Sequence, residues 1–360
     1  MKKALSAISG DGYKILFSKE AYGALNLLLK TENYSSIYIL VDNHTQMHCL
    51  PTFLGHLSEL KNADILKIRA GEDNKHLKTC QDIWQELSEL GADRKSLLIN
   101  LGGGVVSDLG GFVAGAFKRG IDFVNIPTTL LSMVDASVGG KTGVDLGGLK
   151  NQIGIITHPR MVIIDVNYLS TLAENEYRSG YAEMLKHGII RDKNYFKELS
   201  QYKSLENSDI EDYIYHSILI KNAVVTEDLY ESNFRKILNF GHTLGHAIET
   251  HCLNNSQKTT LLHGEAIAIG IITESYLSTQ LCGLEMAVAK KIKEVFLRIF
   301  PKSSFSEKDL KDIINYLRYD KKNSHGKVKF VLIQRLGQPA IDIEVNSKNL
   351  IEAFDFYQQD

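Results

Sequence analysis

The sequence has few cysteines and no long hydrophobic run. Its four cysteines, Cys49, Cys80, Cys252 and Cys282, lie far apart and form no CxxC pair, so they indicate neither a disulfide framework nor a cysteine-rich zinc site. No stretch approaches the roughly 20 consecutive apolar residues that a membrane helix needs. The N-terminal stretch MKKALSAISGDGYK lacks an apolar core long enough for a secretory signal. We therefore expect a cytoplasmic protein that does not use a membrane.

An excess of charge of one sign is also lacking. Lys and Arg total 41 against 43 Asp and Glu, for a formal net charge of −2, which gives no reason to expect nucleic acid or a membrane surface as a partner. The composition is 44% hydrophobic and 23% charged, as is ordinary for a globular protein with buried cores. A length of 360 residues is too long for one ordinary domain and fits two.

Short β-branched runs alternate with helical patterns in the first half of the chain. The runs are continuously apolar rather than alternating, which is typical of parallel strands with helices on both faces of the sheet. Strands are predicted over residues 37–43, 96–104, 123–127 and 161–166, and a helix over 80–90. We predict an α/β domain over residues 1–170.

Helical periodicity dominates after about residue 170. Helices are predicted over residues 174–190, 210–225, 239–250, 264–280 and 286–298, and one strand or hairpin element over 328–337. We predict a second, mostly α-helical domain over residues 171–360.

Two glycine-rich segments are candidates for binding anions. LGGGVVSDLGGFVAG (101–115) joins a strand to a helix, where glycines let the backbone approach a phosphate, although they would equally serve a tight turn and helix packing. Asp42 ends an earlier strand and could accept hydrogen bonds from a ribose. PTTLLSMVDASVGGKTGVDLGGLKN (127–151) is a long polar connection of a kind that is usually functional, with solvated surface lysines as the alternative. Its Lys141, Lys150 and Asn151 could hold phosphate oxygens, and its Asp135 a hydroxyl group.

A carboxylate and several histidines indicate a divalent metal. His242 and His246 in NFGHTLGHAIE lie on one face if that stretch is helical. Glu183 in SGYAEMLKHGII, either His242 or His246, and His263 in LLHGEA would make a catalytic ligand set.

Cationic and amide groups follow these motifs and would suit an anionic, phosphorylated, polyhydroxylated substrate if they converge. They are Lys186, Lys221, Arg235, Asn239, Lys321 and Lys322. Glu231, four residues before Arg235, would most simply be its helical ion-pair partner.

Seven segments, in order along the chain, together resemble the 3-dehydroquinate synthase family, and the match runs from Asp42 to Lys322. They are LGGGVVSDLGGF, IPTTLLSMVDASVGGKTGVD, LKNQIG, AEMLKHG, RKILNFGHTLGHAIE, LLHGEA and DKK. The resemblance implies a sugar phosphate cyclase with a Rossmann-like NAD-binding α/β domain and a helical metal- and substrate-binding domain. It also implies NAD and a divalent metal, zinc or cobalt, as cofactors, and a homodimer as the assembly.

The resemblance carries roles onto individual residues. The metal ligands are Glu183, His242 and His263, while His246 faces the substrate phosphate and takes part in proton transfer. The NAD contacts are Asp42, Glu72, Lys75, Gly103, Gly104, Val105, Asp108, Thr128, Thr129, Lys150, Leu169 and Thr171. The substrate contacts are Arg119, Asp135, Lys141, Asn151, Lys186, Lys221, Arg235, Asn239, His246 and one of Lys321 and Lys322. The catalytic groups are His246, Glu231, Lys186, Lys141 and Asn239, with Glu231 as a proton acceptor. Arg119 reaches the substrate of the neighbouring subunit.

The implied reaction is that of a carbon–oxygen lyase acting on phosphates, in the shikimate pathway to chorismate and the aromatic amino acids. It converts 3-deoxy-D-arabino-heptulosonate 7-phosphate into 3-dehydroquinate and phosphate. The steps are transient oxidation by NAD, β-elimination of phosphate, re-reduction, ring opening and aldol closure. The alternatives are a related cyclase of the 2-deoxy-scyllo-inosose or valiolone type and a metal alcohol dehydrogenase of the glycerol dehydrogenase type.

Overall fold

The computed structural model describes residues 5–147, 149–201, 207–317 and 328–359, and the chain divides into two compact units. The N-terminal unit comprises Met1–Ala173 together with Asn207–Asn222, and the C-terminal unit comprises Glu174–Glu206 together with Ala223–Asp360. The domain ranges predicted from the sequence, 1–170 and 171–360, stay predictions. No helix of the described residues is long and apolar enough to cross a membrane.

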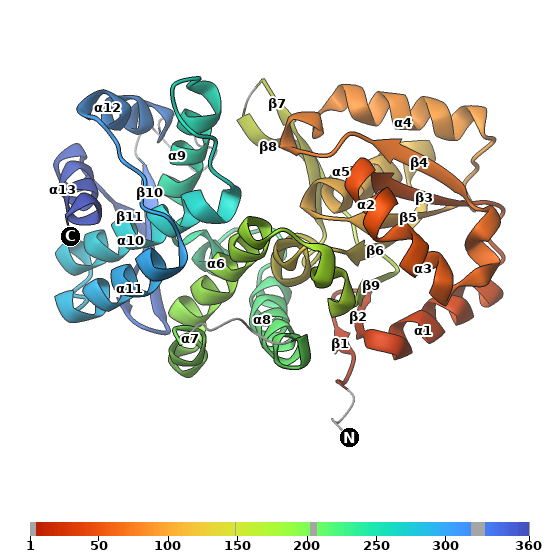
Figure 1. The fold of residues 1–360 in the computed structure, drawn as a ribbon, viewed down its shortest axis with the longest axis horizontal. Helices are drawn as coiled ribbons and strands as arrows, with labels where there is room; N and C mark the ends of the chain where they lie inside the picture. Colours follow the sequence, from red (N-terminus) through yellow and green to blue (C-terminus); the bar gives the residue numbers. More distant parts are fainter. Residues whose placement is uncertain (1–4, 148, 202–206, 318–327, 360) are drawn as a thin grey trace. The chain divides into compact units, whose positions relative to one another are not determined.

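The N-terminal unit is built on a seven-stranded sheet in the order β1-β2-β9-β6-β5-β3-β4 (Figure 1). Only the β1–β2 pair is antiparallel. The strands are β1 (Ile8–Ser9), β2 (Lys14–Phe17), β3 (Ile37–Asp42), β4 (Asp64–Ile68), β5 (Leu97–Gly102), β6 (Asp122–Pro127) and β9 (Met161–Ile164). The four strands predicted from continuous apolar runs are β3, β5, β6 and β9, and all four lie in this sheet.

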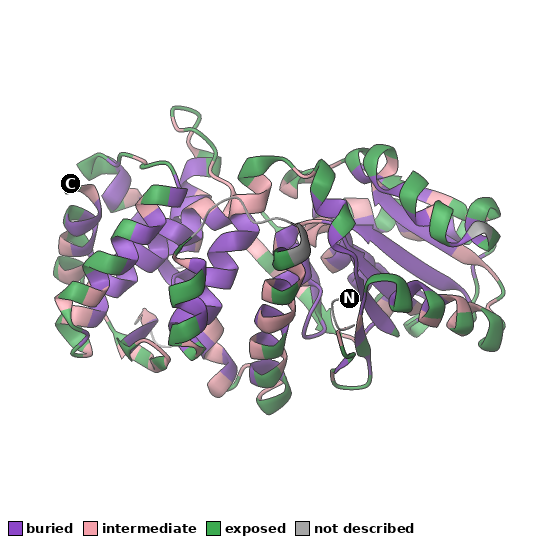
Figure 2. Cartoon of the chain, turned by 60° about the horizontal axis from the view of Figure 1, so that its bottom comes forward, coloured by how far each residue is buried: buried purple, intermediate pink, exposed green. Residues whose placement is uncertain are grey.

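The central strands are buried because helices cover the sheet, as Figure 2 shows. Tyr38 and Leu40 of β3 pack in one cluster with the apolar faces of α4 (Leu77–Glu89) and α5 (Gly104–Ala116). The helices and turns of this unit are α1 (Ser18–Thr31), α2 (Asn43–His48), α3 (Leu50–His56), η1 (Ser58–Asn62), η2 (Glu72–Asn74), α4 (Leu77–Glu89), α5 (Gly104–Ala116), η3 (Phe117–Arg119), η4 (Ser132–Ala136) and η5 (Val166–Thr171). Part of α8 (Asn207–Glu227) belongs here as well.

The polar connection over residues 127–151 contains regular structure that the sequence reading did not predict. η4 is a π-helical turn, a form that often occurs at functional sites. It is followed by an antiparallel hairpin of β7 (Lys141–Leu146) and β8 (Leu149–Ile156). Gly143 is needed in this hairpin, because a Cβ there would lie 2.4 Å from the carbonyl oxygen of Ile153.

The C-terminal unit is mostly helical, as predicted. Its elements are α6 (Glu174–Arg191), α7 (Lys193–Leu199), η6 (Phe234–Asn239), α9 (His242–Asn254), α10 (His263–Leu281), α11 (Met286–Ile299), α12 (Glu307–Tyr316), β10 (Lys329–Arg335), β11 (Gln338–Glu344) and α13 (Ser347–Gln358). α10 is buried along most of its length and packs against α6, α9, α11, α13 and β10, as expected of a core helix. β10 lies within the strand or hairpin element predicted over residues 328–337, and it pairs with β11, which lies beyond that range.

The single helix predicted over residues 239–250 is wrong at its start. Asn239 ends the short 3₁₀ helix η6, and α9 begins only at His242. The break falls at Gly241, whose φ of +81° is left-handed, a conformation that glycine adopts without a steric penalty. Asn239 and His242 therefore belong to different helices.

Candidate active site

Three helices of the C-terminal unit approach closely because small residues lie where they cross. A Cβ on Gly264 of α10 would lie 2.3 Å from Cα of Ser179 on α6. A Cβ on Gly270 of α10 would lie 1.9 Å from the carbonyl oxygen of Gly241, just before α9. These contacts leave no room for larger side chains, so the start of α10 lies against α6 and the start of α9 lies against the middle of α10.

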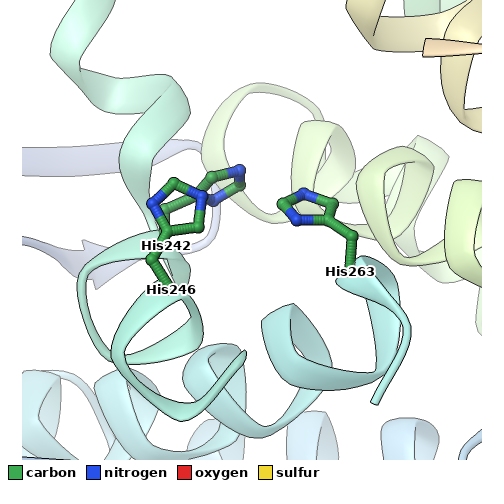
Figure 3. A group of neighbouring side chains, drawn as sticks. All are labelled: His242, His246 and His263. Atoms are coloured by element: carbon green, nitrogen blue, oxygen red, sulfur yellow. The ribbon is translucent and has the colours of Figure 1, made fainter. Parts of the chain in front are cut away.

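The close crossing brings one carboxylate and three imidazoles together. Glu183 of α6 is fully buried, and its Oε1 lies 3.5 Å from Nε2 of His242 and 3.7 Å from Nε2 of His263. The ring of His246 is 5.2 Å from that of His242 and 5.7 Å from that of His263, centroid to centroid. Figure 3 shows the three imidazoles facing a common space, two from α9 and one from the start of α10.

The Nδ1 atoms of two of these rings have polar partners. Nδ1 of His242 lies 3.2 Å from the carbonyl oxygen of Phe240, and Nδ1 of His263 lies 3.4 Å from Oε2 of Glu249. In metal sites such partners fix the ring orientation and the tautomer, so that the other nitrogen is available to the metal. Both rings turn Nε2 toward Glu183.

Neighbouring charges shift the pKa values of groups in this cluster. Burial alone would raise the pKa of Glu183, but Lys186 and the two histidines outweigh it and hold the pKa well below its ordinary value. Burial would lower the pKa of His263, but Glu249 and Glu183 raise it to about 9. In the metal-free protein the Glu183 carboxylate is therefore ionised and His263 carries a proton, which a metal ion would have to displace.

The donors in this cluster fit a divalent metal. Lys186 forms an ion pair with Oε2 of Glu183, yet neither buried carboxylate oxygen receives a hydrogen bond of ordinary geometry from the described residues. One nitrogen from each of His242, His246 and His263 lies within 4.8 Å of the others. Imidazole and carboxylate donors suit zinc or cobalt. Distance alone does not separate His246 from the two predicted histidine ligands, so the predicted set of Glu183, His242 and His263 stays a prediction.

The segment before α9, a loop followed by η6, presents three further predicted residues. Arg235 is buried and donates through a guanidinium nitrogen to the carbonyl oxygen of Leu229 at 2.7 Å. Asn239 donates to the carboxylate of Glu231, which has a left-handed φ of +56°. Glu231 lies outside any helix, so the helical ion pair with Arg235 is wrong, because its geometry requires a continuous helix.

Asp228 organises this loop and was not singled out from the sequence. Its carboxylate accepts hydrogen bonds from the backbone N–H groups of Ser232, Asn233 and Arg235 at 2.8–3.1 Å. Partial burial would raise the pKa of Asp228, but these backbone donors lower it to about 2. The only sequence signal for this role is an Asp that precedes its hydrogen-bond donors by four to seven residues, and this signal is weak.

The predicted NAD contacts include residues at the carboxyl ends of β3 and β5 in the N-terminal sheet. β3 pairs with β4 on one side and β5 on the other, so the chain changes direction between β3 and β5, where ligands of open α/β sheets bind. Asp42 ends β3 and caps α2, its Oδ1 accepting from the N–H groups of His44 and Thr45 at 2.8 Å. Gly103 and Gly104 follow β5 and open α5.

The glycine-rich segment after β5 has two roles. A Cβ on Gly103 would lie 3.0 Å from Cγ2 of Thr129, so this glycine permits a close approach at the start of α5. A Cβ on Gly110 would lie 2.0 Å from Oδ1 of Asn100, and a Cβ on Gly111 would lie 2.4 Å from Cγ2 of Thr142. The first glycines shape the turn, and the later ones pack α5 on the sheet and the hairpin.

Four of the predicted NAD contacts form one charged cluster. Nζ of Lys75 lies 2.7 Å from Oδ2 of Asp108 and 3.9 Å from Oε1 of Glu72, which in turn lies 3.4 Å from Nζ of Lys150. Burial alone would lower the pKa of Lys75, but Asp108 and Glu72 outweigh it and raise the pKa. Lys75 also donates to the side chain of Asn151 at 2.7 Å, so a predicted substrate contact joins this cluster.

Asp135 and Lys221 form a second polar pair of the N-terminal unit. Asp135 lies on the π-helical turn η4, and Nζ of Lys221 donates to its Oδ1 at 2.6 Å. Lys221 is buried, so this ion pair holds both predicted substrate contacts in place.

The remaining predicted residues are distributed over the N-terminal unit. Val105 lies in the first turn of α5, Thr128 and Thr129 directly follow β6, Leu169 and Thr171 lie on η5, and Lys141 begins β7. Arg119 is exposed on η3 with a left-handed φ of +71°. Lys321 and Lys322 lie outside the described residues.

Solved structures first define the class. A 2-deoxy-scyllo-inosose synthase complexed with carbaglucose-6-phosphate, NAD+ and Co2+ matches with a TM-score of 0.83 at 22% identity, covering 98% of this chain and 99% of that one. A 2-epi-5-epi-valiolone synthase from Streptomyces hygroscopicus with NAD+ and Zn2+ bound matches with a TM-score of 0.81 at 22% identity over 99% of both chains. An iron-containing alcohol dehydrogenase from Thermococcus thioreducens matches with a TM-score of 0.66 at 15% identity, covering 97% of this chain and 99% of that one. The fold is therefore that of the sugar phosphate cyclases, with a weaker likeness to metal alcohol dehydrogenases.

Sequence relatives then define the family. Residues 65–179 match the family model for the 3-dehydroquinate synthase N-terminal domain, and residues 180–323 match that for the C-terminal domain. A 3-dehydroquinate synthase from Parabacteroides distasonis is 38% identical over 348 residues, covering 96% of this chain and 98% of that protein. One from Dictyoglomus thermophilum is 39% identical over 338 residues, covering 92% of each. The chain belongs to the 3-dehydroquinate synthase family and is an enzyme of that family, as its motifs predicted.

Proposed function

We propose that this enzyme converts 3-deoxy-D-arabino-heptulosonate 7-phosphate into 3-dehydroquinate and phosphate, as a carbon–oxygen lyase acting on phosphates. The observation that carries the proposal is the buried Glu183 carboxylate facing Nε2 of both His242 and His263, in a chain related to 3-dehydroquinate synthases over most of its length. A carboxylate with two imidazoles is a ligand set that leaves positions open for a substrate oxygen.

Glu183, His242 and His263 would hold the zinc or cobalt ion, which when bound polarises a substrate hydroxyl group and the ketone derived from it. Glu249 and the carbonyl oxygen of Phe240 would keep the two imidazoles in the orientation that binding requires.

The segments that follow the carboxyl ends of β3 and β5 would hold NAD, which when bound takes a hydride from the substrate and later returns it. Gly103 and Gly104 at the start of α5 would bring backbone N–H groups close to the pyrophosphate. The Glu72, Lys75, Asp108 and Lys150 cluster would supply further polar contacts to the cofactor.

Each unit has its own predicted groups for the anionic substrate. In the C-terminal unit, Lys186, Asn239 and His246 would bind the phosphate, Arg235 the carboxylate, and Glu231 would accept a proton. In the N-terminal unit, Lys141 and Asn151 would bind phosphate oxygens, Asp135 a hydroxyl group and Lys221 the carboxylate.

We also propose a cytoplasmic homodimer in which the exposed Arg119 reaches the substrate of the neighbouring subunit. The strained turn supports this role, because Lys118, Arg119 and Gly120 all have positive φ. Backbone strain of this kind is often found at functional positions.

Turnover of the heptulosonate phosphate tests the proposal. With catalytic NAD and added zinc or cobalt, phosphate and 3-dehydroquinate should form in equal amounts without net NADH. Glu183→Ala should lose bound metal and about a thousandfold or more in kcat, while far-ultraviolet circular dichroism stays that of the wild type.

Two outcomes would contradict the proposal. Stoichiometric NADH accumulation would indicate an alcohol dehydrogenase. Turnover of a sugar phosphate without a carboxylate, in preference to the heptulosonate, would indicate a cyclase of the inosose or valiolone type, since Arg235 would then have no carboxylate to bind.

A further inference from the structure

Glu274 is a buried carboxylate with no role in the proposed chemistry. It lies on α10, is fully buried, and was not singled out from the sequence. A charge in a helical core is costly unless other groups satisfy it. Its partners therefore indicate what the residue does.

The carboxylate of Glu274 holds the backbone on both sides of His242. Its Oε2 accepts from the N–H of Gly241 at 2.6 Å, and its Oε1 accepts from the N–H of Leu244 at 3.1 Å. Both are donors at the N-terminus of α9, where amides have no partner within the helix. The two bonds fix the first turn of α9 against α10.

The same carboxylate also offsets the partial positive charge at the N-terminus of α9. His242 is the first residue of α9, and His263 is the first residue of α10. The N-terminus of a helix carries partial positive charge, which disfavours a cation nearby. A buried anion on the amides of α9 counteracts this effect at the position of His242.

We propose that Glu274 is a positioning residue for His242. By holding His242 in place, Glu274 sets the affinity and the coordination geometry of the metal site. It acts through the amides of Gly241 and Leu244 and does not itself bind the metal. The inference rests on the proposed function, because it assumes that His242 is a metal ligand.

Cobalt titration into the metal-free full-length protein tests the proposal. Glu274→Gln keeps the length of the side chain but has only one oxygen acceptor, so it cannot accept hydrogen bonds from both amides. It should weaken cobalt binding about 10- to 100-fold, as losses around metal ligands commonly do, and change the visible absorption of the bound cobalt. Glu274→Asp keeps the charge but is one methylene shorter, and should fall between Glu274→Gln and the wild type.

Asp309→Asn is the matched control. Asp309 is also a buried carboxylate of the C-terminal unit. It accepts from the backbone N–H of Ser306 in the capping box of α12 and from His251. Its loss should lower the thermal unfolding temperature while leaving cobalt affinity and the cobalt spectrum unchanged. Stability and metal binding are thereby measured separately.

The outcomes separate the inference from the proposed function. Absence of cobalt binding by the wild type would overturn the proposed metal site and the inference with it. Wild-type affinity and spectrum in Glu274→Gln would overturn the inference alone. Failure of both Glu274 variants to fold in the presence of cobalt would assign Glu274 to the fold of the C-terminal unit and would also overturn the inference.

Discussion

His242 and His246 show that side chains one turn apart on a helix can have different surroundings. Nδ1 of His242 lies near the carbonyl oxygen of Phe240, and its Nε2 faces the buried Glu183. His246 is more exposed than His242, and its ring lies beside the rings of the other two histidines. We therefore expect substitution of the two residues to separate metal binding from proton transfer.

The expected results differ for the two alanine variants. His242→Ala should lose about 100-fold or more in metal affinity, because a direct ligand is removed. His246→Ala should keep metal affinity near that of the wild type and lose about 10²- to 10⁴-fold in kcat, the range for a general acid–base group. Equilibrium dialysis with zinc and steady-state kinetics at saturating metal measure the two effects.

Equal loss of metal by the two variants would contradict this division. It would instead favour a three-histidine ligand set, which the mutual proximity of His242, His246 and His263 also permits.

At the scale of elements, glycines determine how closely α6, α9 and α10 approach. Gly264 and Gly270 are the two contact points on α10. Neither has a positive φ, so it is the close approach of a neighbouring backbone that requires glycine at these two positions.

Gly270→Ala should therefore destabilise the protein. Its Cβ would overlap the carbonyl oxygen of Gly241, and overpacking of this kind typically costs about 1–3 kcal/mol. Gly23→Ala in the middle of α1 is the control, because a Cβ there meets no atom within 4 Å. That change should be neutral or stabilise by up to about 1 kcal/mol, since alanine favours helix more than glycine does. Urea denaturation of the metal-free proteins measures both, and equal stabilities would contradict the packing argument.

At the scale of the whole molecule, the proposed homodimer places one predicted residue in a different chain from the site it serves. Arg119 is exposed on a strained turn of the N-terminal unit, whereas Glu183 is buried in the C-terminal unit. Two variants that inactivate different parts of a site can complement each other only if those parts come from different subunits.

Mixing Arg119→Ala with Glu183→Ala should therefore restore activity. Each parent should be nearly inactive, and refolding an equal mixture should give roughly a quarter of wild-type activity, because half the dimers are hybrids with one complete site. Steady-state phosphate release measures the recovery. The unmixed parents, refolded in the same way, are the control. No recovery, despite hybrid dimers detected by differently tagged subunits, would show that Arg119 does not act across subunits.

The sequence by itself determined the fold class, the helical second half and the family. Continuous apolar runs specify buried parallel strands, as in β3 and β5, because both faces of such a strand lose contact with water. The long motifs around Glu183, His242 and His263 identified the family. Sequence also supplied the candidate site residues, since residue type limits which groups can bind a metal or a phosphate.

Only the tertiary structure decided which side chains meet. The contact of Glu274 with α9 depends on where two separate helices cross. The break at Gly241 and the loop held by Asp228 depend on irregular backbone conformations that periodicity does not specify. The Glu274 contacts join residues that lie 33 and 30 positions apart in the chain, and no local periodicity encodes them. Asp228 and Glu274 resemble ordinary surface acids in the sequence. The partners of Asp228 are set by the folding of its own loop, and the burial and partners of Glu274 arise only when the helices pack. The residue types of NFGHTLGHAIE thus predicted a metal site, while the carboxylate that holds the first turn of α9 comes from another helix.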